Sequence, residues 1–98
     1  MNNDEKNVFR KNCIIKLTDS LTMLRAKTGA SQAEIAEVIG IARQTYFAIE
    51  SGRKNMSWNT FMSLILFFKE NTKTRDILNI LGIYTDELER YIKIEKMV

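Results

Sequence analysis

Every glycine of this chain stands where a helix-periodic run of apolar residues ends, and the chain contains no proline. Glycine tolerates the left-handed backbone that closes a helix, whereas proline would interrupt one. The glycines are Gly29, Gly40, Gly52 and Gly82. No alternating apolar–polar run is long enough to indicate a sheet. The pattern predicts an all-α chain, and its 98 residues suffice for one domain.

The segment before Gly29 predicts the first helical part. Its apolar residues recur every three or four positions and so share one helical face; they are Phe9, Cys13, Leu17, Leu21 and Leu24. One helix over about residues 4–28 satisfies the pattern. A break near residues 18–20 does so equally, because Thr, Asp and Ser can cap a new helix. We expect an N-terminal helical extension over residues 1–17 and the main domain over residues 18–82.

Residues 31–39 predict a short helix with a defined start. Ser31 and Glu34 have the spacing of a capping box, in which each side chain accepts a bond from the other's backbone amide. The expected buried stripe is Ile35, Val38 and Ile39, and small Ala36 suits the close approach of another helix. Gly40 then permits a tight turn.

A second short helix is expected from about residue 43 to residue 51. Tyr46 and Ile49 are three apart and point inward, which leaves the other side chains outside: Ala42, Arg43, Gln44, Phe47, Ala48 and Ser51. Gly52 closes this helix, and the basic loop Arg53-Lys54-Asn55 follows. Two helices joined by a tight turn over residues 31–51, beside a basic edge, can place a helix in the DNA major groove.

Three further helices are expected downstream. Their capping residues are Ser57, then Thr72 or Thr74, then Thr85. Their inward residues are Phe61, Leu64, Ile65 and Phe68; then Ile77, Leu78 and Leu81; then Leu88, Tyr91 and Ile92, with Trp58 expected in the core. The last helix belongs to a C-terminal segment over residues 83–98. Its apolar stripe can pack on the chain's own core or serve as a dimer surface, and the sequence leaves both open.

The composition removes several classes of function. The net charge of +3 is mildly basic, which suits a polyanionic partner but does not identify one. The chain has no histidine and a single cysteine, so an internal disulfide, the usual zinc sites and histidine-dependent hydrolases are excluded. Cys13 lies among apolar neighbours and is expected to be a small buried hydrophobe. We expect no catalytic residue, no metal and no cofactor.

No run of about eighteen apolar residues is present, so no membrane span is expected. The polar N-terminal residues MNNDEKN differ from a signal peptide. We therefore expect a cytoplasmic protein that is not an enzyme.

A set of residues at fixed offsets extends over about residues 21–81. It comprises Leu24-Arg25, then Gly29, Ser31-Gln32 and Ile35-Ala36, then Ile39-Gly40-Ile41, then Tyr46, Ile49-Glu50 and Gly52-Arg53. This set resembles the phage-repressor helix-turn-helix proteins of the Cro/cI or XRE family. The resemblance implies a lambda-repressor-like five-helix DNA-binding domain, with an ion pair of Arg25 and Glu50 that ties the first helix to the recognition helix. Tyr46 departs from the pattern, where Val or Ile is commoner, and its hydroxyl needs a partner.

The outward residues of this motif suggest contacts with DNA. Base contacts are expected from Arg43, Gln44, Phe47 and Ala48, because arginine suits guanine, glutamine suits adenine and apolar groups suit the thymine methyl. Phosphate contacts are expected from Ser31, Gln32, Thr45, Ser51, Arg53, Lys54 and Asn55. The alternative is that the charged and polar residues are solvated surface groups and that Phe47 is a protein contact.

The sequence thus predicts a bacterial or phage transcriptional regulator, most simply a repressor, that reads double-stranded DNA with residues 43–51. A homodimer on two half-sites is the usual arrangement. The alternative is a protein-interaction module on the same fold, such as an antitoxin or a partner-binding regulator. No small-molecule effector is expected, because the remaining residues are too few for an effector domain.

Overall fold

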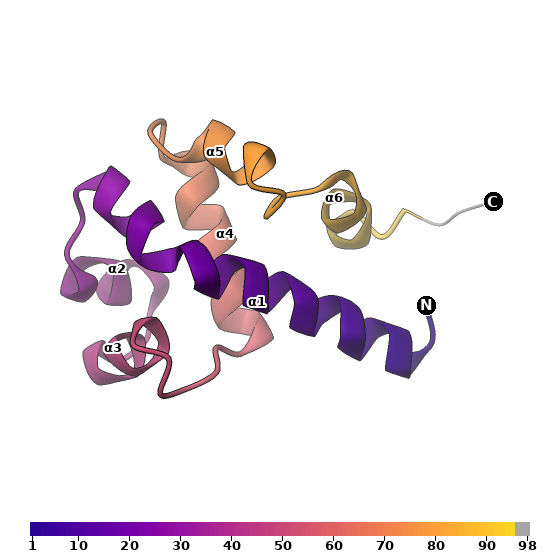
Figure 1. Cartoon of the computed structure of the whole chain (residues 1–98), viewed down its shortest axis with the longest axis horizontal. Helices are drawn as coiled ribbons and strands as arrows, with labels where there is room; N and C mark the ends of the chain where they lie inside the picture. Colours follow the sequence, from indigo (N-terminus) through magenta and orange to yellow (C-terminus); the bar gives the residue numbers. More distant parts are fainter. Residues whose placement is uncertain (96–98) are drawn as a thin grey trace.

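Six α-helices and no strand make up residues 1–95, the part of the 98-residue chain that this computed structural model describes (Figure 1). The helices are α1 (Asn3–Thr28), α2 (Gln32–Ile39), α3 (Arg43–Glu50), α4 (Trp58–Glu70), α5 (Arg75–Ile80) and α6 (Asp86–Ile92). The all-α prediction is therefore confirmed. The last three residues of the expected C-terminal segment lie outside the described residues.

The long helix α1 crosses in front of α4, and the other helices are arranged around this pair (Figure 1). In that view α2 and α3 lie below the C-terminal half of α1, α5 lies above it, and α6 lies over its N-terminal half. The two ends of the described chain lie on the same side of the molecule.

Helix α1 is one continuous helix of 26 residues rather than a broken pair. The Asn2 side chain accepts a bond from the Glu5 amide at 2.8 Å and starts the helix. Thr18, which could have capped a second helix, instead donates its hydroxyl to the Ile14 carbonyl at 2.7 Å, a bond made inside one helix. The helix therefore passes through residues 17 and 18 without interruption, and Leu17 from the expected extension is fully buried.

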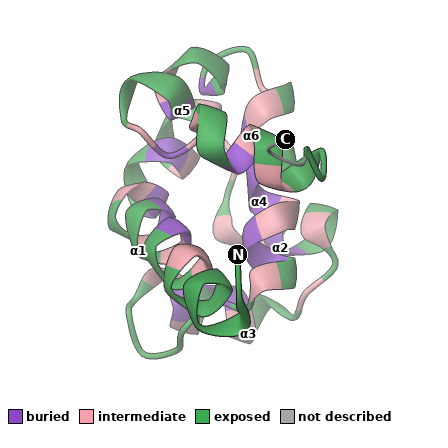
Figure 2. Ribbon diagram, turned by 90° about the vertical axis from the view of Figure 1, so that its right-hand side faces the viewer, coloured by how far each residue is buried: buried purple, intermediate pink, exposed green. Residues whose placement is uncertain are grey.

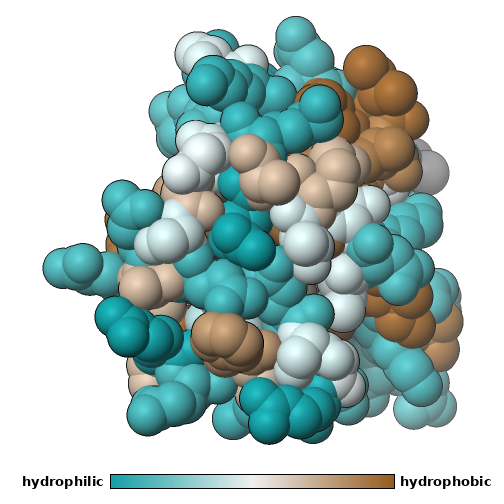
Figure 3. Space-filling model, turned by 60° about the vertical axis from the view of Figure 1, so that its left-hand side comes forward, coloured by the Kyte–Doolittle hydropathy of each residue, from teal (hydrophilic) through white to brown (hydrophobic). Residues whose placement is uncertain are grey.

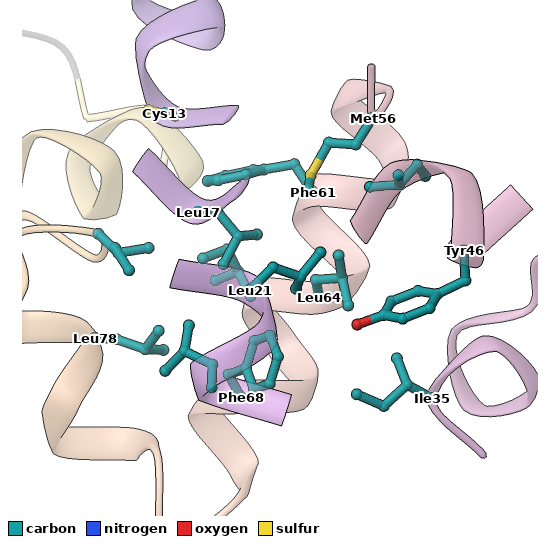
Figure 4. Close-up of a cluster of buried hydrophobic side chains, with 14 of the residues drawn as sticks. Cys13, Leu17, Leu21, Ile35, Tyr46, Met56, Phe61, Leu64, Phe68 and Leu78 are labelled. Carbon is teal, nitrogen blue, oxygen red and sulfur yellow. The ribbon is translucent and has the colours of Figure 1, made fainter. Parts of the chain in front are cut away.

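The core lies between α1 and α4, and the other helices close it (Figure 4). Its central side chains are all at most 1% exposed; they are Leu17, Leu21, Leu24, Phe61, Leu64 and Phe68. Figure 2 shows the buried residues on the inner sides of the helices and exposed residues on the outer sides. Each such side chain contributes about 1.5–3 kcal/mol of apolar burial, so this pair of helices positions the rest.

Helix α6 packs on the chain's own α1 and α4. Leu88 is fully buried, and Arg10 of α1 donates from Nε to the Tyr91 hydroxyl at 2.9 Å. The Arg10 guanidinium also lies 5.2 Å from the centre of the half-buried Trp58 ring, within the range of a cation–π contact. Of the two uses expected for the C-terminal apolar stripe, the structure shows packing within the monomer, with only Ile92 of the stripe exposed.

Besides Ile92, two residues that were expected to face inward are exposed instead. Val38 is 67% exposed and Leu81 is 43% exposed, so both predictions are wrong. Helix α2 buries the adjacent pair Ile35 and Ala36, and this turns its inner face away from Val38. Beyond the Gly82 turn, Ile83 is buried in place of Leu81.

Within residues 1–95, no helix combines the length and apolar character needed to cross a membrane.

Tyr46 of α3 is fully buried, and its ring points into the core (Figure 4). Its hydroxyl oxygen makes no hydrogen bond with any of the described residues, so the partner that it was expected to need is missing. Burial, reinforced by the nearby Glu50 carboxylate, raises the pKa of the Tyr46 hydroxyl well above its ordinary value. The ring therefore serves packing, while the hydroxyl costs stability.

We predict that Tyr46→Phe raises the free energy of unfolding by about 1 kcal/mol, because it removes an unsatisfied buried polar group and keeps the ring. Tyr46→Ala should lower that free energy by about 3 kcal/mol, because it leaves a cavity. Urea unfolding followed by circular dichroism measures both variants. A loss of stability in Tyr46→Phe would show that the hydroxyl has a stabilising partner.

Candidate nucleic-acid interface

The turn between α2 and α3 is fixed by backbone hydrogen bonds at the end of α2. The Gly40 amide donates to the Glu37 carbonyl at 3.2 Å, and the Ile41 amide donates to the Ala36 carbonyl at 3.0 Å. This pair of bonds is a Schellman motif, which requires the left-handed backbone that Gly40 has, with φ of 80°. The angle between the two helices is thus set by local chemistry as well as by packing.

Helix α2 itself begins with the expected capping box. The Ser31 hydroxyl accepts from the Glu34 amide at 3.0 Å, and the Glu34 carboxylate accepts from the Ser31 amide at 2.8 Å. These bonds hold the pKa of the Glu34 carboxyl below its usual value. The Ser31 hydroxyl oxygen is therefore already engaged within the chain.

Helix α3 has an inner side and an outer side. Tyr46 and Ile49 are at most 1% exposed, whereas Arg43, Gln44 and Phe47 are exposed. Ala48, which was expected on the outer side, and Thr45, which was expected to contact phosphate, are half-buried. The N-cap residue, Ala42, has no side-chain acceptor for the amides of the first turn. The backbone amides of the first turn, which begins at Arg43, therefore have no side-chain cap, and they form the positive end of the helix dipole.

The loop after α3 is folded back onto the helix end. The Arg53 and Lys54 amides both donate to the Ala48 carbonyl, at 2.9 and 3.1 Å, and Gly52 provides the left-handed residue with φ of 83°. Arg53 also donates from Nε to the Ser51 hydroxyl at 3.1 Å. All residues of this loop, 51–55, are exposed. Because the backbone bonds fix the loop, the two cationic residues Arg53 and Lys54 have a defined place beside α3.

Glu50, the last residue of α3, joins three segments of the chain. Arg25 of α1 donates from Nε to Glu50 Oε2 and from Nη2 to Glu50 Oε1, each at 3.0 Å, which makes a two-pronged ion pair. Gln32 of α2 donates from Nε2 to Glu50 Oε2 at 3.2 Å. Arg25 also donates from Nη1 to the Ala30 carbonyl at 3.3 Å. Helices α1, α2 and α3 therefore meet at one carboxylate.

The environment of this ion pair sets the charge of both partners. The Glu50 side chain is 4% exposed and that of Arg25 is 22% exposed. Burial alone would raise the pKa of the Glu50 carboxyl, but the polar groups around it, Arg25 above all, outweigh burial and lower that pKa. The bond to Glu50 raises the pKa of Arg25. At neutral pH the Glu50 carboxyl is therefore ionised, and the charge of Arg25 balances its negative charge.

Apart from Thr45, the polar and charged residues predicted to contact DNA fall into two groups in the structure. Arg43, Gln44, Lys54 and Asn55 are exposed and make no side-chain hydrogen bond within residues 1–95. The side chains of Ser31, Gln32, Ser51 and Arg53 are bonded inside the chain, although all but Gln32 remain exposed. Figure 3 turns the side with α2 and α3 forward and shows a mostly hydrophilic surface, with an apolar cluster at the upper right of the view.

Two features of this region were not expected from the sequence. The bond from Gln32 to Glu50 depends on how α2 meets α3, and the only local signal was a polar residue at the start of α2. The open first turn of α3 could have been predicted, because Ala42 cannot accept a bond from the amides that follow it.

A family model described as a helix-turn-helix domain matches residues 16–67, which is more than half of the chain. This range contains the C-terminal half of α1, all of α2 and α3, and the greater part of α4. No curated protein and no solved structure matches the chain.

We predict that Glu50→Gln lowers the free energy of unfolding by about 2 kcal/mol at neutral pH, because it leaves the Arg25 charge without its partner. The matched control is Glu37→Gln, which alters an exposed carboxyl on α2. Urea unfolding at a series of pH values measures both variants.

The pH dependence follows from the lowered pKa of Glu50. The folded state then holds fewer protons than the unfolded state, so the stabilisation is complete above the ordinary carboxyl pKa and is lost as pH falls through the lowered one. The stability difference between the unmodified protein and Glu50→Gln should be constant near neutral pH and shrink below about pH 4. A difference that grew with acidity would contradict the assignment.

Proposed function

The chain belongs to the helix-turn-helix domain family, and on that basis we propose that it binds double-stranded DNA as a sequence-specific transcriptional regulator of the Cro/cI or XRE type. The observation that carries the proposal is that α3 has one buried side and one exposed side. Tyr46 and Ile49 anchor its inner side, while Arg43 and Gln44 extend from its outer side without a bond to the described chain. A helix held in this way can enter the major groove without rearrangement.

The base contacts are assigned to the exposed residues of α3. Arg43 can donate two bonds to guanine O6 and N7, and Gln44 can pair with adenine N6 and N7. Phe47, which is 49% exposed, and the half-buried Ala48 lie on the same helix and offer apolar contact to a thymine methyl.

The phosphate contacts are assigned to the two edges of α3. The loop carries the cations of Arg53 and Lys54, with Asn55 beside them, and Ser51 positions Arg53 through its hydroxyl. On the other edge, Ser31 and Gln32 open α2, and Thr45 lies in the first turn of α3. Because the Gln32 side chain is bonded to Glu50, the backbone amides at the start of α2 are the better phosphate donors at that edge.

Electrostatics on this surface favour a polyanion. Arg43, Arg53 and Lys54 are exposed, and Glu50, the carboxylate nearest in the sequence to Arg53 and Lys54, is neutralised by Arg25. The ion pair therefore has two effects, since it fixes α3 and removes a negative charge from beside the DNA backbone.

The simplest action of such a protein is repression by occupying a promoter, as a homodimer in the cytoplasm. A second candidate is a protein-interaction module on the same fold. The exposed aromatic ring of Phe47 favours it, because such rings are enriched at protein interfaces. Selection of bound duplexes from a random pool separates the two functions. Enrichment of a motif supports DNA reading, and absence of any enrichment contradicts it.

We predict that Arg43→Ala weakens binding to the selected duplex by about 1–3 kcal/mol and relaxes the preference at one base pair. Lys73→Ala is the control, since Lys73 is an exposed cation in the turn between α4 and α5. Fluorescence anisotropy with single-base variants of the duplex measures the effect. An equal loss on every variant would show that Arg43 contacts phosphate rather than a base.

We predict that Lys54→Ala weakens binding to all duplexes alike and reduces the slope of log affinity against log salt by about one. The reason is that one phosphate contact, and the counterion that it releases, is lost. A salt titration of the same duplexes measures this slope, with Lys73→Ala again as the control. An unchanged slope would remove Lys54 from the phosphate contacts.

A further inference from the structure

The outer face of α1 carries apolar side chains that the monomer does not use. Val8 is 60% exposed, Ile15 is 46% exposed and Met23 is 38% exposed. They are seven and eight residues apart, so they follow one side of the helix. The core residues of α1, such as Leu17 and Leu21, lie on the opposite side. Exposed apolar side chains that share one side of a long helix are candidates for contact with a partner, and what lies beside them decides whether one fits.

A groove lies beside the N-terminal half of this row. It lies between α1 and the segment 82–87 and has a volume of roughly 600 Å³. Its apolar lining includes Val8, Phe9, Cys13 and Ile83. Three carboxylates also line it, from Asp4, Glu5 and Glu87, while Lys16 lies toward the middle of α1. An apolar side chain followed by a cation would fit this groove.

The C-terminal half of α1 offers that combination. Met23 is exposed, and Lys27, also exposed, follows four residues later and therefore lies one turn further along the same side. Ile15 lies between the groove and this pair. At a rise of about 1.5 Å per residue, Val8 is about 10.5 Å before Ile15 and Met23 is about 12 Å after it. The same spacing places Asp4 and Lys27 at similar distances from Ile15 on its two sides.

We propose that a second copy of this chain binds here, with the two α1 helices antiparallel and related by a two-fold axis near Ile15. Ile15 then meets its counterpart on the axis, and Met23 of each copy enters the groove beside Val8 of the other. Lys27 of each copy faces the partner's acidic groove edge near Asp4. Each surface is complementary to itself, which is the requirement for a closed two-fold dimer.

This arrangement suits the reading of two DNA half-sites, and that use rests on the proposed function. Figure 1 shows α1 across the front of the molecule, and Figure 2 shows it along one side; in both views α3 lies at the lower end. A two-fold axis that runs vertically in the view of Figure 1, in front of α1, places both α3 helices on the same side of the dimer. The dimer thus presents two reading helices to one duplex.

The first test is the oligomeric state of the full chain by sedimentation equilibrium. We expect a monomer–dimer equilibrium in which Ile15→Glu raises the dissociation constant at least about tenfold, because two like charges meet on the axis. Leu66→Glu is the matched control, since Leu66 is an exposed apolar residue on α4. Circular dichroism checks that each variant is folded. A chain that stays monomeric, or a dimer that Leu66→Glu weakens and Ile15→Glu does not, overturns the proposal.

The second test is independent of Ile15. Lys27→Asp should weaken the dimer several-fold, and Asp4→Lys in the same chain should restore it, because the charges of the pair are exchanged. In a Cys13→Ala background, Ile15→Cys should form a disulfide dimer on mild oxidation, whereas Leu66→Cys should not. Absence of both the rescue and the cross-link overturns the proposal. Neither test uses DNA, so failure of the dimer and failure of DNA binding are distinguished.

Discussion

The position of α3, the helix proposed to read DNA, depends on the hydrogen bonds that the Glu50 carboxylate accepts. Arg25 from α1 and Gln32 from α2 both donate to it, so the end of α3 is held against the two helices before it. Apolar packing of Tyr46 and Ile49 fixes the depth of α3 but is not directional. Charged hydrogen bonds are directional, and they determine how α3 is turned about its own axis. The outward direction of Arg43 and Gln44 follows from both.

Much of the fold could be predicted because its determinants are local. The capping box of Ser31 and Glu34 and the glycine at position 40 specify where α2 begins and ends, and the structure shows the bonds that this chemistry implies. The pairing of Arg25 with Glu50 came from the family resemblance, because no local rule joins residues 25 positions apart. The structure places the two side chains in contact, whereas their part in DNA reading is a proposal.

The features that sequence reasoning missed depend on tertiary contacts. Val38 has the period of a buried residue, but α2 buries Ile35 and Ala36 instead, since short helices present a narrow inner face. The sequence left open whether the first helix breaks near residues 18–20; the structure has one continuous helix, in which the Thr18 hydroxyl bonds to the Ile14 carbonyl instead of capping a new helix. The unsatisfied hydroxyl of Tyr46 could not be foreseen, because its surroundings come from several helices. For α1, the sequence predicted the side that packs in the core but not the exposed apolar side chains of Val8, Ile15 and Met23 on the other side.

The central claim is that the outer side of α3 and the loop after it contact DNA. Nuclear magnetic resonance titration of the labelled protein with a selected duplex tests this claim most directly. We expect the largest shifts at the Arg43, Gln44 and Phe47 resonances and at residues 53–55, with α5 resonances unchanged. Shifts confined to helices other than α2 and α3, or no shift with any duplex, would contradict the claim.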